Sequence, residues 1–144
     1  MKETLAVETR KQIILAVKFR LGPANDSPDF IRVLRKVEQA GRRIALVIGD
    51  KGYDSESNHE YVREVFGGRS VIPVRTGDDP RHRVRGRYRR EQRKRFDLVA
   101  YRQRVKTETV NSVQKRTMGS HVLSRKIGQQ HMELMFRGLA YNLG

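Results

Sequence analysis

The sequence contains no cysteine, which excludes disulfide bonds and metal sites built from thiolates. No apolar run is long enough to cross a membrane, and the first residues, MKETLAVETRK, lack the apolar core of a signal peptide. Acidic residues are scarce in the second half: residues 81–144 hold 4 Asp and Glu against 17 Lys and Arg, whereas residues 1–80 hold 12 against 14. These absences favour a cytoplasmic protein.

The excess of positive charge indicates a polyanionic partner. The formal net charge is +15, and residues 81–95 (RHRVRGRYRREQRKR) carry nine Arg or Lys with one acid, Glu91. Within a basic insertion or loop at about residues 75–100, we predict an arm or strand that binds nucleic-acid phosphates, with Tyr88 available to stack on a base. The cations assigned to this contact are Arg87, Arg89, Arg90 and Arg93. The alternatives are a solvated basic loop and a membrane surface, but no segment combines a basic face with a strong apolar face.

The order of apolar patterns predicts one α/β domain over the 144 residues. The runs 4–8 and 13–21 are typical of an antiparallel strand pair, and 44–48 is typical of a buried strand with 70–74 as its parallel partner. We expect a helix from Asn25-Asp26-Ser27-Pro28, where Asp26 is a cap, to about Ala40, where Gly41 ends it, with Phe30, Val33, Leu34 and Val37 on one face. Further helices are expected over 56–66, 101–116 and 129–142. The core side of the last helix is expected to consist of Met132, Met135, Phe136, Leu139 and Ala140.

Asp50 directly follows the expected buried strand 44–48. Acidic residues at the carboxyl end of such a strand lie where ligand crevices form in α/β proteins. A turn residue is the equally weighted alternative for Asp50.

The stretch 101–116 places four functional side chains close together on a helical wheel. At roughly 100° per residue, Tyr101, Arg104, Glu108 and Lys115 fall within about 60° of one another. This face carries one carboxylate between two cations. A solvated face with ion pairs along the helix is the plainer interpretation.

Asp50 and Glu108 together suit a metal ion. Carboxylate and phosphate oxygens are the ligands that Mg²⁺ or Mn²⁺ prefers, and two such ions can activate the attacking oxygen and stabilise the leaving oxygen of a phosphodiester. Arg104 and Lys115 would then hold a DNA strand by its phosphates.

The spacing Tyr101-x2-Arg104-x3-Glu108-x6-Lys115 resembles the Y-x2-R-x3-E-x6-K signature of DDE transposases of the insertion-sequence-four group. Asp-Lys-Gly-Tyr-Asp at 50–54 is similar to the segment with that family's second catalytic aspartate, and 22–27 and 137–142 are similar to weaker landmarks. The resemblance implies a ribonuclease-H-like fold and metal-dependent cleavage and joining of DNA. It matches Asp50 to the second acid, Glu108 to the third, and Arg104 and Lys115 to contacts with transposon-end DNA, with Tyr101 supporting the site.

In that family the first aspartate lies on a strand upstream of the hairpin at 4–21, with which this sequence begins. We therefore expect a partial transposase catalytic domain that lacks its first strand, binds metal weakly and is inactive alone. The alternatives are a non-catalytic DNA-binding remnant of a transposase and a basic RNA- or ribosome-associated protein. Transposon-end DNA is the expected partner, with a homodimer and a separate upstream segment as further candidates, in a prokaryotic cytoplasm and on the nucleoid when bound to DNA.

Overall fold

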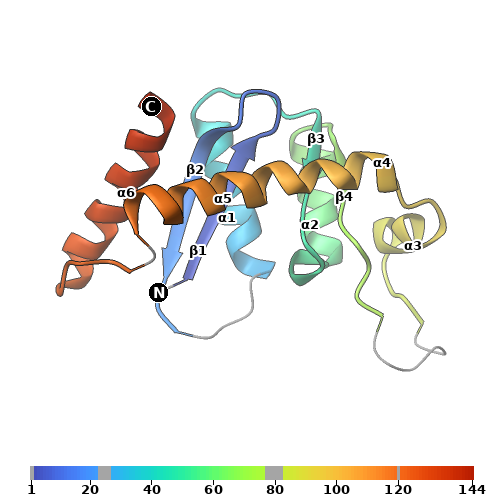
Figure 1. The fold of residues 1–144 in the computed structure, drawn as a ribbon. Coiled ribbons are helices and arrows are strands. Elements are labelled where there is room, and N and C mark those ends of the chain that lie inside the picture. The colour runs from blue at the N-terminus through green and yellow to red at the C-terminus, as the bar shows by residue number, and fades with distance from the viewer. Residues whose placement is uncertain (1, 23–26, 77–82, 120) are drawn as a thin grey trace. The chain divides into compact units, whose positions relative to one another are not determined.

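The computed structural model describes residues 2–22, 27–76, 83–119 and 121–144 (Figure 1). The chain divides into two compact units. Unit 1 comprises residues 1–23 and 105–144, and unit 2 comprises residues 24–104. The predicted cap Asp26 lies outside the described residues. In the described ranges, no helix is both long and apolar enough to span a lipid bilayer.

Unit 1 is built on the predicted hairpin. Strands β1 (Lys2–Glu8) and β2 (Ile13–Arg20) pair antiparallel, with Lys2 opposite Arg20 and an irregularity between Ala6 and Val7. Helix α5 (Val105–Met118) contacts β1, and helix α6 (Ile127–Leu143) contacts β2 (Figure 1). The antiparallel pair predicted from the sequence is therefore confirmed.

Helix α6 packs through a different side than predicted. Leu134 and Gly138, one turn apart, are its buried residues. Gly138 faces Val17 of β2, and a Cβ there would make ordinary van der Waals contact with the Val17 side chain, at 3.7 Å. The prediction of a methionine-rich core side was wrong, because these side chains are more than half exposed: Met132 57%, Met135 64%, Phe136 61% and Leu139 54%. Ala140 is exposed as well.

The contact between α6 and β2 continues on both sides of Leu134 and Gly138. His131 stacks on Phe19, with 5.9 Å between ring centroids. At the other end, the Asn142 side chain accepts a hydrogen bond from the Ile14 N–H (2.9 Å) and donates one to the Ile14 carbonyl (2.8 Å). Asn142 thus pairs with the main chain of β2 in the way that a neighbouring strand would.

Unit 2 contains the predicted parallel strand pair. Strands β3 (Leu46–Ile48) and β4 (Arg69–Val71) pair in parallel, with Val47 opposite Ser70. Their connection is the predicted helical segment, which consists of α2 (Glu56–Glu60) followed by the π-helical turn η2 (Tyr61–Val65). Residues of β3 are half-buried instead of fully buried, since in the described chain this strand pairs on one side only.

The core of unit 2 lies between helix α1 (Ser27–Gln39) and the helical connection. Phe30, Leu34, Val62 and Ile72 form its buried cluster. The predicted apolar face of α1 is confirmed, since Val33 and Val37 are buried together with Phe30 and Leu34. The remaining elements of the unit are η1 (Lys51–Tyr53), α3 (Arg87–Lys94), α4 (Leu98–Tyr101) and η3 (Arg102–Arg104).

Candidate functional site

Asp50 lies two residues beyond β3, at the carboxyl end of the parallel pair. Gly49 continues the pairing through its N–H, which donates to the Val71 carbonyl at 3.1 Å. A Cβ at Gly49 would lie 3.1 Å from Ile72, so glycine lets the chain pass close to the core just before Asp50. The Asp50 carboxylate caps η1 by accepting from the Lys51 N–H at 2.8 Å, and its side chain is 57% exposed.

An arginine of the predicted signature contacts this carboxylate. Arg104 Nη1 lies 3.7 Å from Asp50 Oδ2, and the same guanidinium lies over the Tyr101 ring, 5.7 Å from its centroid. Residues 102–104 form a 3₁₀ turn, in which side chains three residues apart eclipse one another. The spacing of Tyr101 and Arg104 therefore brings these two side chains into contact and directs the cation to Asp50.

The predicted single helix over 101–116 is interrupted at this turn. Tyr101 ends α4, and α5 begins only at Val105. The boundary between the two units falls at the same place, so Tyr101 and Arg104 belong to unit 2 while Glu108 and Lys115 belong to unit 1. The common face of the four residues, and a site that joins Asp50 to Glu108, stay predictions.

On α5, Val110 is fully buried whereas Glu108 and Lys115 are exposed. The charge of Lys115 acts on Glu3 of β1: burial raises the pKa of Glu3, the Lys115 and Arg137 cations lower it, and the net shift is upward. Glu3 thus lies near Lys115, and Lys115 is two helical turns from Glu108 along α5.

Glu8, the other acid of the hairpin, is committed to the turn between β1 and β2. Its carboxylate accepts from the main-chain N–H groups of Arg10 (2.9 Å) and Lys11 (2.6 Å). These two hydrogen bonds lower the pKa of Glu8. Its role is to close the hairpin.

The basic segment is more ordered than its sequence suggests. The prediction of an arm or strand was wrong for residues 87–94, which form helix α3. Glu91, the one acid of α3, pairs with Arg63 of η2 at 3.2 Å, which links the helix to the rest of unit 2. The Arg63 guanidinium also lies over the Tyr88 ring, 5.4 Å from its centroid. Tyr88 therefore has a cationic neighbour within the protein.

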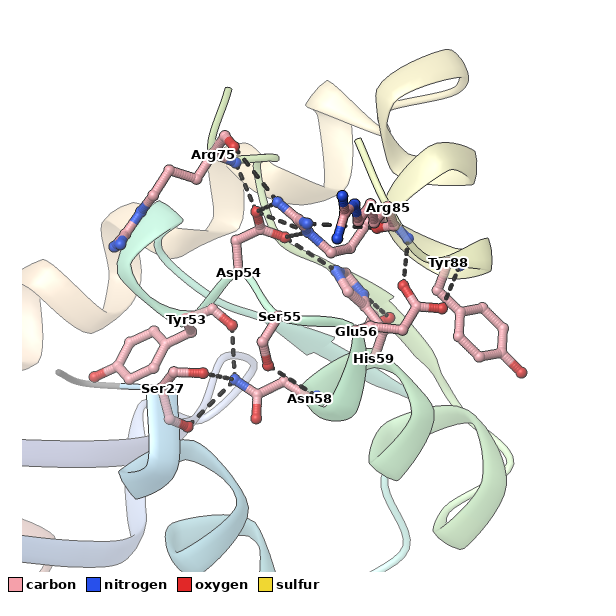
Figure 2. Close-up of polar contacts among 12 residues, drawn as sticks. Ser27, Tyr53, Asp54, Ser55, Glu56, Asn58, His59, Arg75, Arg85 and Tyr88 are labelled. Atoms are coloured by element: carbon pink, nitrogen blue, oxygen red, sulfur yellow. Dashed lines mark hydrogen bonds and ion pairs between the residues drawn. The ribbon is translucent and has the colours of Figure 1, made fainter. Parts of the chain in front are cut away.

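Asp54 is the main anchor of α3 (Figure 2). Its side chain has no exposed surface, and it accepts three hydrogen bonds from Arg89: two from Nε at 2.9 and 3.1 Å and one from Nη2 at 2.7 Å. The Arg75 N–H donates a further bond at 2.7 Å. Burial raises the pKa of Asp54, but the His59 ring, Arg89 and the Arg75 N–H outweigh it and hold this pKa well below its ordinary range.

His59 connects the anchor to strand β4. The imidazole is fully buried, its Nδ1 lies 2.7 Å from Ser70 Oγ, and its Nε2 lies 3.8 Å from Asp54. The second distance is too long for a hydrogen bond, so this contact is electrostatic. The serine, histidine and aspartate are all buried, and the arrangement has no access for a substrate.

Glu56 holds the first turn of α3. Its carboxylate accepts from the N–H groups of Tyr88 (2.9 Å) and Arg89 (3.1 Å), which are two of the donors that a helix N-terminus leaves unpaired (Figure 2). Gly86, just before the helix, has φ 96°, and a Cβ there would overlap the Glu56 carboxylate. Only glycine fits both its backbone conformation and this close approach.

The sequence interpretation missed the roles of Asp54 and Glu56. Asp54 and Ser55 were both candidates for the cap of α2, and Ser55 has that role, with its Oγ accepting from the Asn58 N–H at 3.2 Å. The available signal was the pair of acids at the start of α2, Asp54 just before it and Glu56 as its first residue, in a chain with a dense basic segment. Opposite charges of that kind have to meet if the basic segment is to fold.

The described residues do not by themselves fit a two-ion metal site. Among them, no three His, Asp or Glu side chains come together as metal ligands. Asp50 offers the oxygen chemistry that Mg²⁺ prefers, but its neighbour is the Arg104 cation, and Asp54 is occupied by Arg89. Asp50 would hold an ion only with acidic ligands from outside unit 2.

Comparison with protein families gives one result. A family model described as "Transposase DDE domain" matches residues 1–143. No curated protein matches the sequence. No solved structure matches it either.

Proposed function

Because the chain belongs to the transposase DDE domain family, we propose that it acts in DNA transposition by binding transposon-end DNA and contributing Asp50 and Glu108 to a site for phosphoryl transfer. The proposal includes the ribonuclease-H-like fold and kinship with the insertion-sequence-four group. It places the protein in a prokaryotic cytoplasm, and on the nucleoid when it is bound to DNA.

The observation that carries the proposal is the contact between Arg104 and Asp50. An arginine next to a strand-end carboxylate can bind a phosphate bidentately while the carboxylate faces the same phosphodiester. Arg104 is held from its other side by the Tyr101 ring. Three residues that the sequence singled out for one site are thus neighbours within unit 2.

The proposed division of roles follows from the chemistry of each side chain. Arg104 and Lys115 position the DNA backbone, because guanidinium and ammonium groups bind phosphate oxygens. An Mg²⁺ or Mn²⁺ ion held by Asp50 and Glu108, with a further acidic ligand, would supply the Lewis acid for phosphodiester cleavage. Two carboxylates are one fewer than a two-ion site of this type requires, so the 144 residues alone should not cleave or join DNA.

A second candidate function is DNA binding without catalysis. It is favoured by the exposed arginines of α3 together with the absence, among the described residues, of a three-acid metal cluster. In this case Asp50 and Arg104 form an ordinary surface ion pair, and Asp50 caps η1 without a catalytic role.

Cleavage of a labelled DNA duplex in Mg²⁺ or Mn²⁺ distinguishes the two candidates. We expect no product from the chain alone, and product once a segment carrying the family's first aspartate is added, fused or in trans. That product should disappear in both Asp50→Asn and Glu108→Gln, while Glu60→Gln, which changes an exposed acid on α2, should keep it. Cleavage that survives Asp50→Asn and Glu108→Gln would contradict the catalytic proposal.

A further inference from the structure

We propose that Asp54 and Glu56 are positioning residues that fasten helix α3 to the turn after Asp50, and that Arg89 serves this attachment instead of contacting nucleic acid. The inference rests on the proposed DNA partner. It assigns different roles to arginines that composition alone cannot distinguish.

The first support is that the hydrogen-bonding capacity of Arg89 is used within the protein. Its Nε and Nη2 donate to Asp54, Nη1 donates to the Arg85 carbonyl at 3.4 Å, and Nη2 also reaches the Arg75 carbonyl at 3.4 Å. The Arg89 side chain is only 17% exposed. A phosphate would have to displace a buried carboxylate from it.

The second support is that Asp54 and Glu56 bind consecutive parts of one helix. Asp54 holds the Arg89 side chain, and Glu56 holds the main-chain N–H groups of Tyr88 and Arg89. A carboxylate at a helix N-terminus is favourable both for the unpaired N–H groups and for the helix dipole. The N-terminus of α3 is therefore already occupied and is not an anion site for a ligand.

The third support is the location of the attachment. Asp54 ends the turn that Asp50 begins: the Tyr53 N–H donates to the Asp50 carbonyl at 2.9 Å, and the Asp54 N–H donates to the Lys51 carbonyl at 3.2 Å. One short turn thus carries the candidate catalytic carboxylate at its start and the anchor of the basic helix at its end. The position of α3 is tied to the position of Asp50.

The other three arginines of α3 are candidates for contact with DNA. Arg87, Arg90 and Arg93 are exposed. Arg90 donates through Nε to the Gly86 carbonyl at 2.9 Å, and this bond does not use Nη1 or Nη2 of the guanidinium. If the attachment fails, all three lose their fixed arrangement together.

The attachment therefore predicts that Asp54→Asn changes the affinity for DNA in the direction opposite to that expected from net charge alone. The substitution removes one negative charge and changes the formal net charge from +15 to +16. Charge alone predicts tighter DNA binding and no loss of phosphate contacts. The attachment predicts weaker binding, with a slope of log K against log salt that is flatter by up to about 2.7, or about 0.9 for each of three lost phosphate contacts.

The test measures binding of the full 144-residue chain to a labelled DNA duplex by fluorescence anisotropy over a series of salt concentrations. Glu91→Gln is the matched control, because it also removes one acid, in this case from α3 itself, where the Glu91 side chain is 46% exposed and pairs with Arg63. We expect Glu91→Gln to bind at least as tightly as the wild type, and Asp54→Asn to bind more weakly with the flatter slope. Equal or tighter binding by Asp54→Asn would overturn the inference.

If Asp54→Asn does not fold, Arg89→Lys tests the same attachment of α3. It keeps the net charge but removes the paired Nε and Nη2 contacts with Asp54. A direct phosphate contact predicts nearly unchanged binding, whereas the attachment predicts a flatter slope and faster hydrogen exchange in residues 87–94. A wild-type chain without affinity for DNA would reject the proposed function, and a wild-type chain that binds DNA while Arg89→Lys keeps its slope would reject this inference alone.

Discussion

The guanidinium of Arg104 lies beside the carboxylate of Asp50, with 3.7 Å between Nη1 and Oδ2. These residues are 54 positions apart in the sequence, and the contact forms within one compact unit. A metal ion and this guanidinium compete for the same carboxylate. The Arg104 side chain is one third exposed, so the proposed function, in which it contacts a phosphate, does not require a buried cation to move out.

Replacing Arg104 tests whether it contacts DNA. Arg104→Gln should flatten the slope of log K against log salt by about 0.9, since one phosphate contact is lost. Arg43→Gln, which removes an exposed cation between α1 and β3, should leave the slope unchanged. A decrease of the same size in both variants would mean that only the total charge matters.

The distance between the two candidate catalytic acids can be tested with cysteine pairs, because the natural sequence has none. If Asp50 and Glu108 share a two-ion site, their carboxylates should lie within about 4–8 Å. A short bismaleimide should then link Lys51→Cys to Ser112→Cys within one chain in the presence of Mg²⁺ and DNA. The control pair, Lys51→Cys with Lys106→Cys, places the second thiol on another side of α5. Equal yields for the two pairs would contradict a shared site.

The exposed arginines of α3 should account for part of the salt dependence. Arg87→Gln with Arg90→Gln should flatten the slope by about 1.8, for two lost phosphate contacts. The matched double variant Arg42→Gln with Arg43→Gln removes the same charge from the exposed segment after α1. An unchanged slope in the α3 variant would show that this helix is not the contact surface.

Glu133 of α6 should stabilise unit 1 in a pH-dependent way. Hydrogen bonds from the Leu123 N–H, the Ser124 hydroxyl and the Ser124 N–H, with Arg137 at 2.7 Å, lower the pKa of Glu133 from 4.5 to about 2. A lowered carboxyl pKa contributes stability above the unfolded value, and this contribution disappears as the pH falls from 4.5 towards 2. Glu133→Gln should therefore lower the melting temperature clearly at pH 7 and by a smaller amount at pH 3. A deficit that is equally large at both pH values would contradict this origin.

The sequence predicted those elements whose apolar pattern is strong and local. The hairpin, the parallel pair β3 and β4, and helix α1 with its buried face were all identified by short apolar periods and by glycine stops. Asp50 was singled out because it follows the expected buried strand, and Arg104 because of its spacing in the motif that resembles a transposase signature; their catalytic and DNA-binding roles stay predictions. In each case the prediction depends on a few residues that are close together in the sequence.

The parts that the sequence did not predict depend on contacts between distant segments. Helix α3 exists because Asp54 and Glu56, more than 30 residues away, bind its side chains and main chain. The buried side of α6 consists of Leu134 and Gly138, of which a hydrophobicity pattern counts the glycine as neutral, and not of the methionines. The 3₁₀ turn at 102–104 is invisible to a helical wheel that assumes 100° for every residue.

The pairing of Asn142 with Ile14 makes one amide hydrogen a reporter for the last helix. The Ile14 N–H has the Asn142 side chain as its acceptor, so its exchange with solvent deuterium is slow only while the end of α6 remains docked. A single resonance in an NMR spectrum would thus follow the attachment and release of that helix. The same resonance would reveal whether a tag fused after Gly144, two residues from Asn142, disturbs the natural protein.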